Sequence, residues 1–182
     1  NVEVIGNNVG INKNISKKNF FIRKRNSCLV IPEGIESETK IIVDFISKYS
    51  ELYDNTNFII KSHPIFNKNY YANYYKLSKY KNISIVENLN ENVIQQSKYF
   101  LYRGSSLAIN LVICGMIPIY LEDTDNIDIN PFYFCMKDSL KISNIKDLKN
   151  IFDTNNQVDD VIVSNAFDYF HPLNYNSLIR LI

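Results

Sequence analysis

Two short motifs place chemically active side chains directly after predicted strands. Ser62-His63-Pro64 follows the apolar run 58–60, and Arg103-Gly104-Ser105-Ser106 follows the apolar run 99–102. In an open α/β sheet, ligands bind outside the carboxyl ends of the strands, where the N-termini of helices attract phosphate groups. The two motifs therefore predict a single nucleotide-phosphate site at one rim of a sheet.

His63 has the side chain best suited to chemistry in this site. Pro64 favours an extended backbone at His63 and presets φ for a following helix. An imidazole placed there can donate a hydrogen bond to a phosphate oxygen, and its protonated form can neutralise the charge on a departing nucleotide. The alternative is a histidine that only caps the next turn. His171-Pro172 repeats the dipeptide without a preceding strand, and we interpret that copy as structural.

Ser105 and Ser106 form the second half of the predicted site. Gly104 allows a tight turn, and a serine after it is a common N-cap for the apolar helix that follows. One serine is enough for a cap, so the second hydroxyl is spare. With the helix dipole, the pair can hold a phosphate through charge-assisted contacts of roughly 1.5–3 kcal/mol each. Alone the motif favours a cap, and together with His63 it favours phosphate binding.

Two carboxylates follow other predicted strands. Glu33, in Pro32-Glu33-Gly34, follows the run 28–31 and can bind a base amino group, a sugar hydroxyl or an acceptor proton. Glu122 follows the run 117–121 and can bind ribose hydroxyls, as an acidic residue does in dinucleotide-binding folds. Both also fit solvated loop acids, which is the favoured interpretation of Glu122.

Strands that alternate with helices must position these motifs. This alternation predicts an α/β fold, a Rossmann-like doubly wound parallel sheet of about five or six strands with helices on both faces. Pro118 indicates that its strand is not hydrogen-bonded along its full length in mid-sheet. The aromatic side chains of the Tyr-rich segment 66–80 can stack on bases, although their spacing favours packing on the sheet. Strands are predicted at 28–31, 58–60, 83–86, 99–102 and 117–121, and helices over about 36–52, 66–80, 91–96, 107–114, 143–152 and 173–182.

Composition narrows the class of protein. The 182 residues are 46% hydrophobic and carry a net charge of +1, which argues against nucleic-acid binding driven by bulk electrostatics. Cys28, Cys114 and Cys135 are an odd number, and two lie in apolar patterns, so reduced core thiols are expected rather than disulfides or a metal site. The sequence has no apolar run of the roughly 18 residues that span a membrane. It also lacks the glycine-rich, Walker and Gly-x-Ser-x-Gly motifs, which disfavours dehydrogenases, kinases and serine hydrolases.

The sequence divides at about residue 27. Residues 1–26 are polar and basic, and we interpret them as a connector from an N-terminal domain, although such a cluster can also contact a membrane surface or a phosphate. Residues 27–182 are predicted to form the nucleotide-sugar-binding domain. Because the sequence begins at Asn1 and stops within an apolar helical pattern, we expect it to be a fragment of a longer chain.

The order of these motifs resembles the C-terminal half of a GT-B glycosyltransferase. The motifs are Pro32-Glu33-Gly34, Lys61-Ser62-His63-Pro64, Tyr102-Arg103-Gly104-Ser105-Ser106 and the run 115–120. The chain is most similar to the bacterial surface-polysaccharide enzymes that use nucleotide-monophosphate-linked sugars, such as sialyltransferases and capsule Kdo transferases. The HP and SS motifs of those enzymes fall on His63-Pro64 and Ser105-Ser106. The resemblance covers about residues 28–125.

The resemblance implies a function and roles for individual residues. It implies that His63, the expected catalytic residue, contacts the cytidylate of a CMP-linked sugar and assists its departure, while Ser105 and Ser106 hold the phosphate. It implies a glycan acceptor in capsule or lipooligosaccharide biosynthesis, no cofactor and no metal, and a cytoplasmic location that includes the inner face of the plasma membrane. The general base is expected in an N-terminal domain, so the fragment alone is expected to be inactive. The full predicted nucleotide-binding set is Glu33, Gly34, His63, Pro64, Arg103, Gly104, Ser105, Ser106 and Glu122.

Three alternatives stay open at the level of the sequence. The same fold can use a UDP-sugar, a GDP-sugar or a CDP-polyol as its donor. A non-catalytic α/β binding module would use His63 and the serines only as caps. An RNA- or membrane-docking module would use the basic segment 1–26 and the Tyr/Lys-rich segment 66–80.

Overall fold

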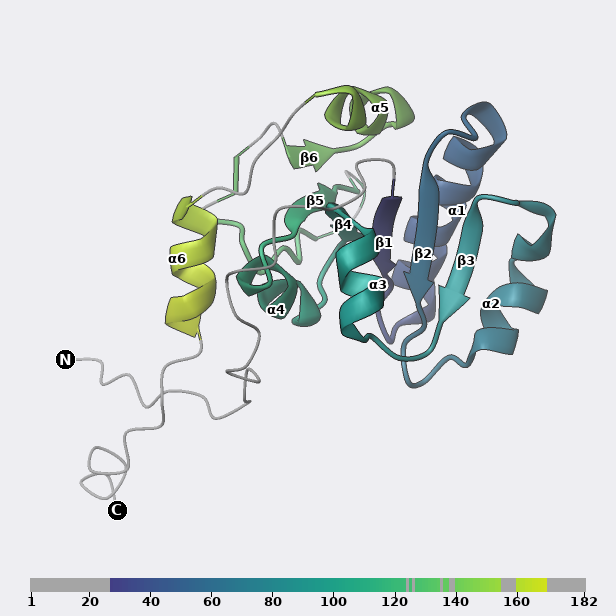
Figure 1. The fold of residues 1–182 in the computed structure, drawn as a ribbon, viewed down its shortest axis with the longest axis horizontal. Coiled ribbons are helices and arrows are strands. Elements are labelled where there is room, and N and C mark those ends of the chain that lie inside the picture. The colour runs from purple at the N-terminus through teal and green to yellow at the C-terminus, as the bar shows by residue number, and fades with distance from the viewer. Residues whose placement is uncertain are drawn as a thin grey trace, which may run out of the picture.

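Parallel strands form one sheet, which is six-stranded in the described part of the chain, in the order β3-β2-β1-β4-β5-β6 (Figure 1). The computed structural model describes residues 27–123, 125, 127–134, 136–137, 140–154 and 160–169. The strands are β1 (Ser27–Ile31), β2 (Asn57–Lys61), β3 (Ile83–Val86), β4 (Tyr99–Tyr102), β5 (Ile117–Leu121) and β6 (Lys141–Ile142). The helices are α1 (Glu36–Leu52), α2 (Lys68–Tyr74), the 3₁₀ helix η2 (Leu77–Lys79), α3 (Glu91–Gln96), α4 (Leu107–Ile113), α5 (Ile145–Asp153) and α6 (Asp160–Tyr169).

The central strands are apolar because both of their faces are covered. Every residue of β1, β4 and β5 is buried. Leu29 of β1 pairs with Ile59 of β2 on one side and with Phe100 of β4 on the other. A parallel sheet covered on both faces has continuous apolar strands rather than alternating ones, which is the pattern that the sequence shows.

The strand order reverses between β1 and β4. The chain runs from β1 outward through β2 to β3, then crosses through α3 to β4 and continues outward through β5 to β6. Right-handed crossovers in opposite directions place α1 and α4 on opposite faces of the sheet (Figure 1). Helix α5 contacts α1, and α6 contacts α4. The fold is therefore the predicted Rossmann-like, doubly wound α/β fold, and the rim between β1 and β4 is the place where such folds bind ligands.

Helix α1 begins at this rim and carries the apolar face that packs on the sheet. Its buried residues include Ile42, Val43, Ile46 and Tyr49. No side chain caps its first turn, but acidic residues occupy that turn and interact favourably with the positive end of the helix dipole.

The Tyr-rich segment was predicted as one helix over 66–80, and this prediction is wrong in its extent. Helix α2 ends at Tyr74, and η2 follows after Lys76, whose φ of 51° is left-handed. A lysine in that conformation interrupts any helix. The prediction that its aromatic residues pack on the sheet is confirmed, since Tyr71 is buried and Tyr70 and Tyr75 pack against the core.

The last strand and α6 were missed by the sequence patterns. Strand β6 has two residues, and they pair with Tyr120 and Leu121. The pairing with β6 therefore begins beyond Pro118, which confirms that the proline's strand is not hydrogen-bonded along its full length. Cys28 and Cys114 are buried and not joined in a disulfide, as predicted, and burial raises the pKa of the Cys28 thiol far above its ordinary value. The predictions for segment 1–26, helix 173–182 and Cys135 lie outside the described residues.

Gly115 ends α4 in a Schellman motif. Its φ is 73°, its N–H donates to Val112 O at 2.7 Å, and the N–H of Met116 donates to Leu111 O at 3.0 Å. We expect Gly115→Ala to lower the free energy of unfolding by about 1–2 kcal/mol, because a Cβ is disfavoured in this conformation.

Urea denaturation followed by far-UV circular dichroism measures this loss. The matched control is Gly115→Asn, which we expect to lose less stability, because asparagine tolerates left-handed backbone better than alanine does. Equal losses for the alanine and asparagine variants would contradict this account of the turn.

Candidate functional site

The ends of β1, β2 and β4 carry most of the predicted residues to one rim, where a doubly wound sheet forms a crevice at the reversal of its strand order. A Cβ added to Gly34 would lie 2.6 Å from His63 Cε1 and 3.1 Å from His63 Nε2. The imidazole, which follows β2, therefore lies directly against the backbone of the loop that follows β1. Only glycine at position 34 leaves room for this contact.

A chain of hydroxyl groups fixes the backbone on both sides of this contact. The N–H of His63 donates to the Tyr71 hydroxyl at 3.3 Å, and that hydroxyl is in hydrogen-bond contact with Thr39. Thr39 Oγ1 donates to the carbonyl of Glu33 at 2.6 Å. Because Thr39 and Tyr71 are fully buried, water does not compete for these bonds, and the two loops hold a fixed relation.

His63 is oriented as a hydrogen-bond donor. The N–H of Ile65 donates to Nδ1 at 3.3 Å, so the neutral imidazole carries its proton on Nε2. Burial, followed by the charge of Lys61, lowers the pKa of His63 below its ordinary value. At neutral pH the side chain therefore presents a neutral Nε2–H donor.

Glu33 occupies the crevice beside the loop that follows β4. The backbone N–H groups of Gly104 and Ser105 face its carboxylate and lower its pKa, yet the net shift is upward because desolvation is larger and Glu38 is a like charge. The buried Oε1 accepts no hydrogen bond. A carboxylate thus lies where an anion would meet these N–H groups, and its raised pKa suits it to exchange a proton.

One serine of the Ser105-Ser106 pair was predicted to serve as an N-cap, and the structure shows no such cap at Ser106. The residue stands at the N-cap position of α4, but its φ and ψ of −63° and −20° are helical and its side chain caps nothing. A capping serine normally has extended backbone, from which its hydroxyl reaches the first turn. The exposed Ser106 side chain and the half-buried Ser105 side chain stand at the rim.

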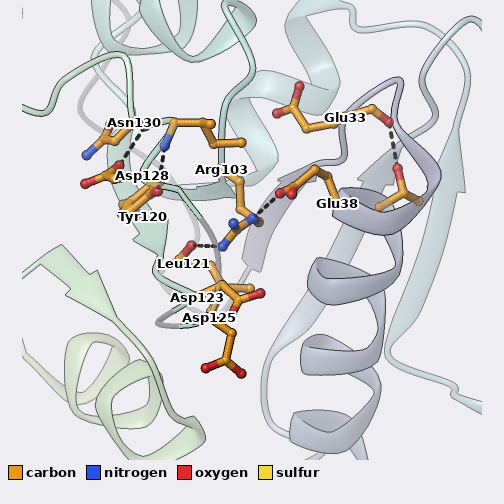
Figure 2. A network of polar contacts seen from close by, with 11 residues as sticks. Glu33, Glu38, Arg103, Tyr120, Leu121, Asp123, Asp125, Asp128 and Asn130 are labelled. Atoms are coloured by element: carbon orange, nitrogen blue, oxygen red, sulfur yellow. Dashed lines mark hydrogen bonds and ion pairs between the residues drawn. The ribbon is translucent and has the colours of Figure 1, made fainter.

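Arg103 lies behind the crevice, although it was predicted to bind the nucleotide. Its side chain is 1% exposed. Figure 2 shows its guanidinium between α1 and the end of β5, where Nε donates to Glu38 Oε2 and Nη1 donates to Leu121 O at 2.8 Å. Nη2 is buried without a hydrogen-bond partner. Arg103 therefore joins β4, α1 and β5, and it positions the loop that begins at Gly104.

The loop that follows β5 forms a wall over Gly104. A Cβ added to Gly104 would lie 2.8 Å from Ile129 Cδ1. Buried Asn130 accepts a hydrogen bond of 2.7 Å from the Tyr102 hydroxyl. The Ile129 N–H donates to the hydroxyl of Tyr120 at 3.3 Å, and Figure 2 shows this tyrosine close to Asp128 and Asn130. The sequence predicted only an acidic loop here. The sequence feature that indicated a packed loop is the pair of tyrosines near the ends of the adjacent strands β4 and β5, Tyr102 and Tyr120.

The structure places the predicted residues in three groups: at the crevice or its rim, behind the crevice, and apart from it. Arg103 is buried behind the crevice, and Pro64 is exposed at the rim beside His63. Glu122 lies apart and lines a groove between α1 and α5. The residues that meet in the crevice or at its rim are Glu33, Gly34, His63, Pro64, Gly104, Ser105 and Ser106.

Neither a metal cluster nor a membrane span occurs in the described part of the chain. Within residues 27–123, 125, 127–134, 136–137, 140–154 and 160–169, no three His, Cys, Asp or Glu side chains gather as metal ligands would. Each helix of that part is too short or too polar to cross a lipid bilayer.

The pKa of His63 can be measured by NMR titration of its ring signals. We expect it below 6.5, the ordinary value, and we expect Lys61→Gln to raise it by removing a nearby positive charge. Because the protonated form is disfavoured only in the folded protein, unfolding takes up a proton. Stability should therefore fall as the pH drops through this range.

The His63→Ala spectrum assigns the signals, since the chain has one other histidine, His171. A pKa of 6.5 or above, or one that Lys61→Gln leaves unchanged, would be inconsistent with the burial of His63 beside Lys61.

We expect Glu33→Gln to increase the free energy of unfolding at pH 7. The folded state raises the pKa of Glu33, so its ionised form destabilises the fold above that pKa, and glutamine removes this charge. The advantage should shrink as the pH falls toward 4.5, because Glu33 is then protonated. Urea denaturation at several pH values measures it.

The matched control for this substitution is Asp54→Asn at an exposed position. We expect it to change stability little at either end of the pH range. A Glu33→Gln protein that is less stable than the parent at pH 7 would show that the carboxylate stabilises its loop.

Comparison with known proteins identified no relative of this chain. No protein-family model matches the chain, and no curated protein matches it. The candidate site therefore rests on the placement of its side chains and on the position of ligand sites in doubly wound sheets.

Proposed function

We propose that this chain is the donor-nucleotide-binding half of a bacterial glycosyltransferase that builds a surface polysaccharide, with a CMP-linked sugar as the donor. One observation carries the proposal. At the rim where the strand order reverses, the loop after β1 holds the imidazole of His63 against Gly34 on one side and faces the N–H groups of Gly104 and Ser105 with Glu33 on the other. The nucleotide would lie in this crevice, with its phosphate between them. As the resemblance implies, the enzyme would work on the cytoplasmic side, which includes the inner face of the plasma membrane.

His63 would act on the leaving nucleotide. When the bond between the anomeric carbon and the phosphate oxygen breaks, the electron pair of that bond moves to the phosphate. The Nε2–H of His63 can donate to that oxygen, and the N–H groups of Gly104 and Ser105 can stabilise the charge that develops. Because these donors are already positioned, little reorganisation is needed as the reaction proceeds.

Glu33 would govern how the phosphate enters. Its carboxylate faces the same N–H groups as the predicted phosphate, so the two anions compete. Either Glu33 swings out, where it can accept a hydrogen bond from a base amino group or a sugar hydroxyl, or it takes up a proton. The hydrogen bonds of His63 to the Tyr71 hydroxyl and to the Ile65 N–H do not involve Glu33, so the imidazole can stay in place during this movement.

A different donor is the second candidate, because nothing in the crevice selects cytosine over other bases. A UDP-sugar, a GDP-sugar or a CDP-polyol would use the same phosphate contacts. The non-catalytic binding module is the third candidate, because Ser106 is exposed and its side chain makes no hydrogen bond to the first turn of α4.

Calorimetric titration with CMP, UMP and GMP tests the proposal. From the resemblance to enzymes that use CMP-linked sugars, we expect selective CMP binding, and we expect His63→Ala to weaken it at least about tenfold, which corresponds to about 1.4 kcal/mol. His171→Ala is the matched control and should bind CMP like the parent, because the second His-Pro copy follows no predicted strand.

The pattern of binding separates the candidates. Selective binding of UMP or GMP would keep the transferase and change its donor. Equal loss in the two alanine variants would remove the role of His63. Failure of all three nucleotides to bind would contradict the proposed site.

A further inference from the structure

A second concave region lies on the other side of Arg103. It is a groove of about 1050 Å³ between α1 and α5, and Glu122 and Asp123 stand at the end near the sheet rim. Both helices begin near that rim, since α1 follows β1 and α5 follows β6. The groove is separate from the crevice of His63, none of whose residues line it.

Aromatic packing closes the groove at its far end. The rings of Tyr49 and Tyr53 lie 5.0 Å apart, and Tyr49 meets Phe152 of α5 at 5.9 Å. The Tyr99 hydroxyl donates to Ile151 O at 3.4 Å and so ties α5 to β4. The two helices are therefore fixed where they meet, and the space between them toward the rim is a built feature of the fold.

The lining combines an apolar floor with polar edges. Ile41 and Phe45 of α1 and the ring of Tyr53 offer apolar surface, while Asn150 and Ser143 offer an amide and a hydroxyl. A ligand that matches this lining has apolar faces and many hydroxyl groups. Sugar rings have both, because their C–H faces pack on aromatic and aliphatic side chains and their hydroxyls bond to amides and carboxylates.

The charges of the lining favour a neutral ligand over an anionic one. Four carboxylates and two lysines line the groove. Asp44 is partly neutralised by Lys40, and Asp147 accepts a hydrogen bond from Asn144 at 2.7 Å. These partners fix the orientation of both carboxylates, which can still accept hydrogen bonds from a ligand. The excess of carboxylates would repel a polyanion.

We infer that this groove binds a neutral oligosaccharide, the acceptor glycan of the transferase, away from the reacting end. The inference rests on the proposed function, since it assigns the groove to that enzyme's second substrate. Leu121 lines the groove, and its carbonyl accepts the hydrogen bond from Arg103 Nη1. One residue therefore joins the head of the groove to the loop of the crevice, and a bound chain that leaves the groove emerges at the rim.

A fluorescence titration tests the inference, because the chain has no tryptophan. Leu52 lines the groove and is 65% exposed, so Leu52→Trp places the sole tryptophan there with little effect on packing. We expect maltohexaose or lacto-N-neotetraose to change its emission saturably, with Kd near the millimolar range typical of weak sites, about −4 kcal/mol. The matched reporter Asn92→Trp, at an exposed position of α3 outside the groove, should not respond.

Second substitutions in the Leu52→Trp protein locate the ligand. We expect Asn150→Ala to weaken binding about fivefold, by loss of one hydrogen bond, and His63→Ala to leave it unchanged. No saturable response to either oligosaccharide up to about ten times the expected Kd would overturn the inference. So would a response to pentalysine in place of the sugars, which would mark a site for a cationic partner.

CMP titration of the same protein distinguishes the two proposals. CMP binding without a response to sugar removes the groove assignment and leaves the proposed function. A response to sugar without binding of any nucleotide removes the proposed donor site, and the groove then stands as a carbohydrate site whose ligand is not the acceptor of this transferase.

Discussion

The buried guanidinium of Arg103 is the interaction on which the arrangement of the rim depends. It has lost nearly all contact with water, and a charge in that position is tolerated only when its partners compensate for the lost hydration. Glu38 supplies the opposite charge from α1, and the Leu121 carbonyl supplies an acceptor from β5. Because each partner comes from a different element, the end of β4 cannot shift without breaking a contact that is costly to lose.

This anchoring explains why the two concave regions of the molecule stay distinct. On one side of the guanidinium, the loop from Gly104 faces Glu33, whose neighbour Gly34 contacts His63. On the other side, Leu121 leads into the groove between α1 and α5. The like charges of Glu33 and Glu38 lie on either side of the loop that enters α1, and Arg103 offsets only part of their repulsion. The rim thus carries a half-buried carboxylate, Glu33, whose charge Arg103 does not fully offset, and such perturbed groups are typical of ligand sites.

The sequence predicted most of the sheet because its strands are buried on both faces. Apolar runs such as 28–31 and 99–102 have no other stable environment in a chain of this composition. Strand β6 was missed since two residues carry no recognisable pattern, and Lys76 gave no sign that it would break the Tyr-rich helix. The rule that the carboxyl ends of parallel strands share one rim was enough to predict that His63 and Gly34 lie close together. The burial of Arg103 was not predicted, because its partner Glu38 lies in α1, far away in the sequence.

The contact between His63 and Gly34 has a consequence for how this protein can vary. The two positions are distant in the sequence, yet the space that the imidazole fills is the space that any side chain at position 34 would need. Substitution at one position therefore changes what is tolerated at the other. A lineage that exchanged the histidine for a small residue can then accept alanine at position 34, and a histidine that returned would have to place its ring elsewhere.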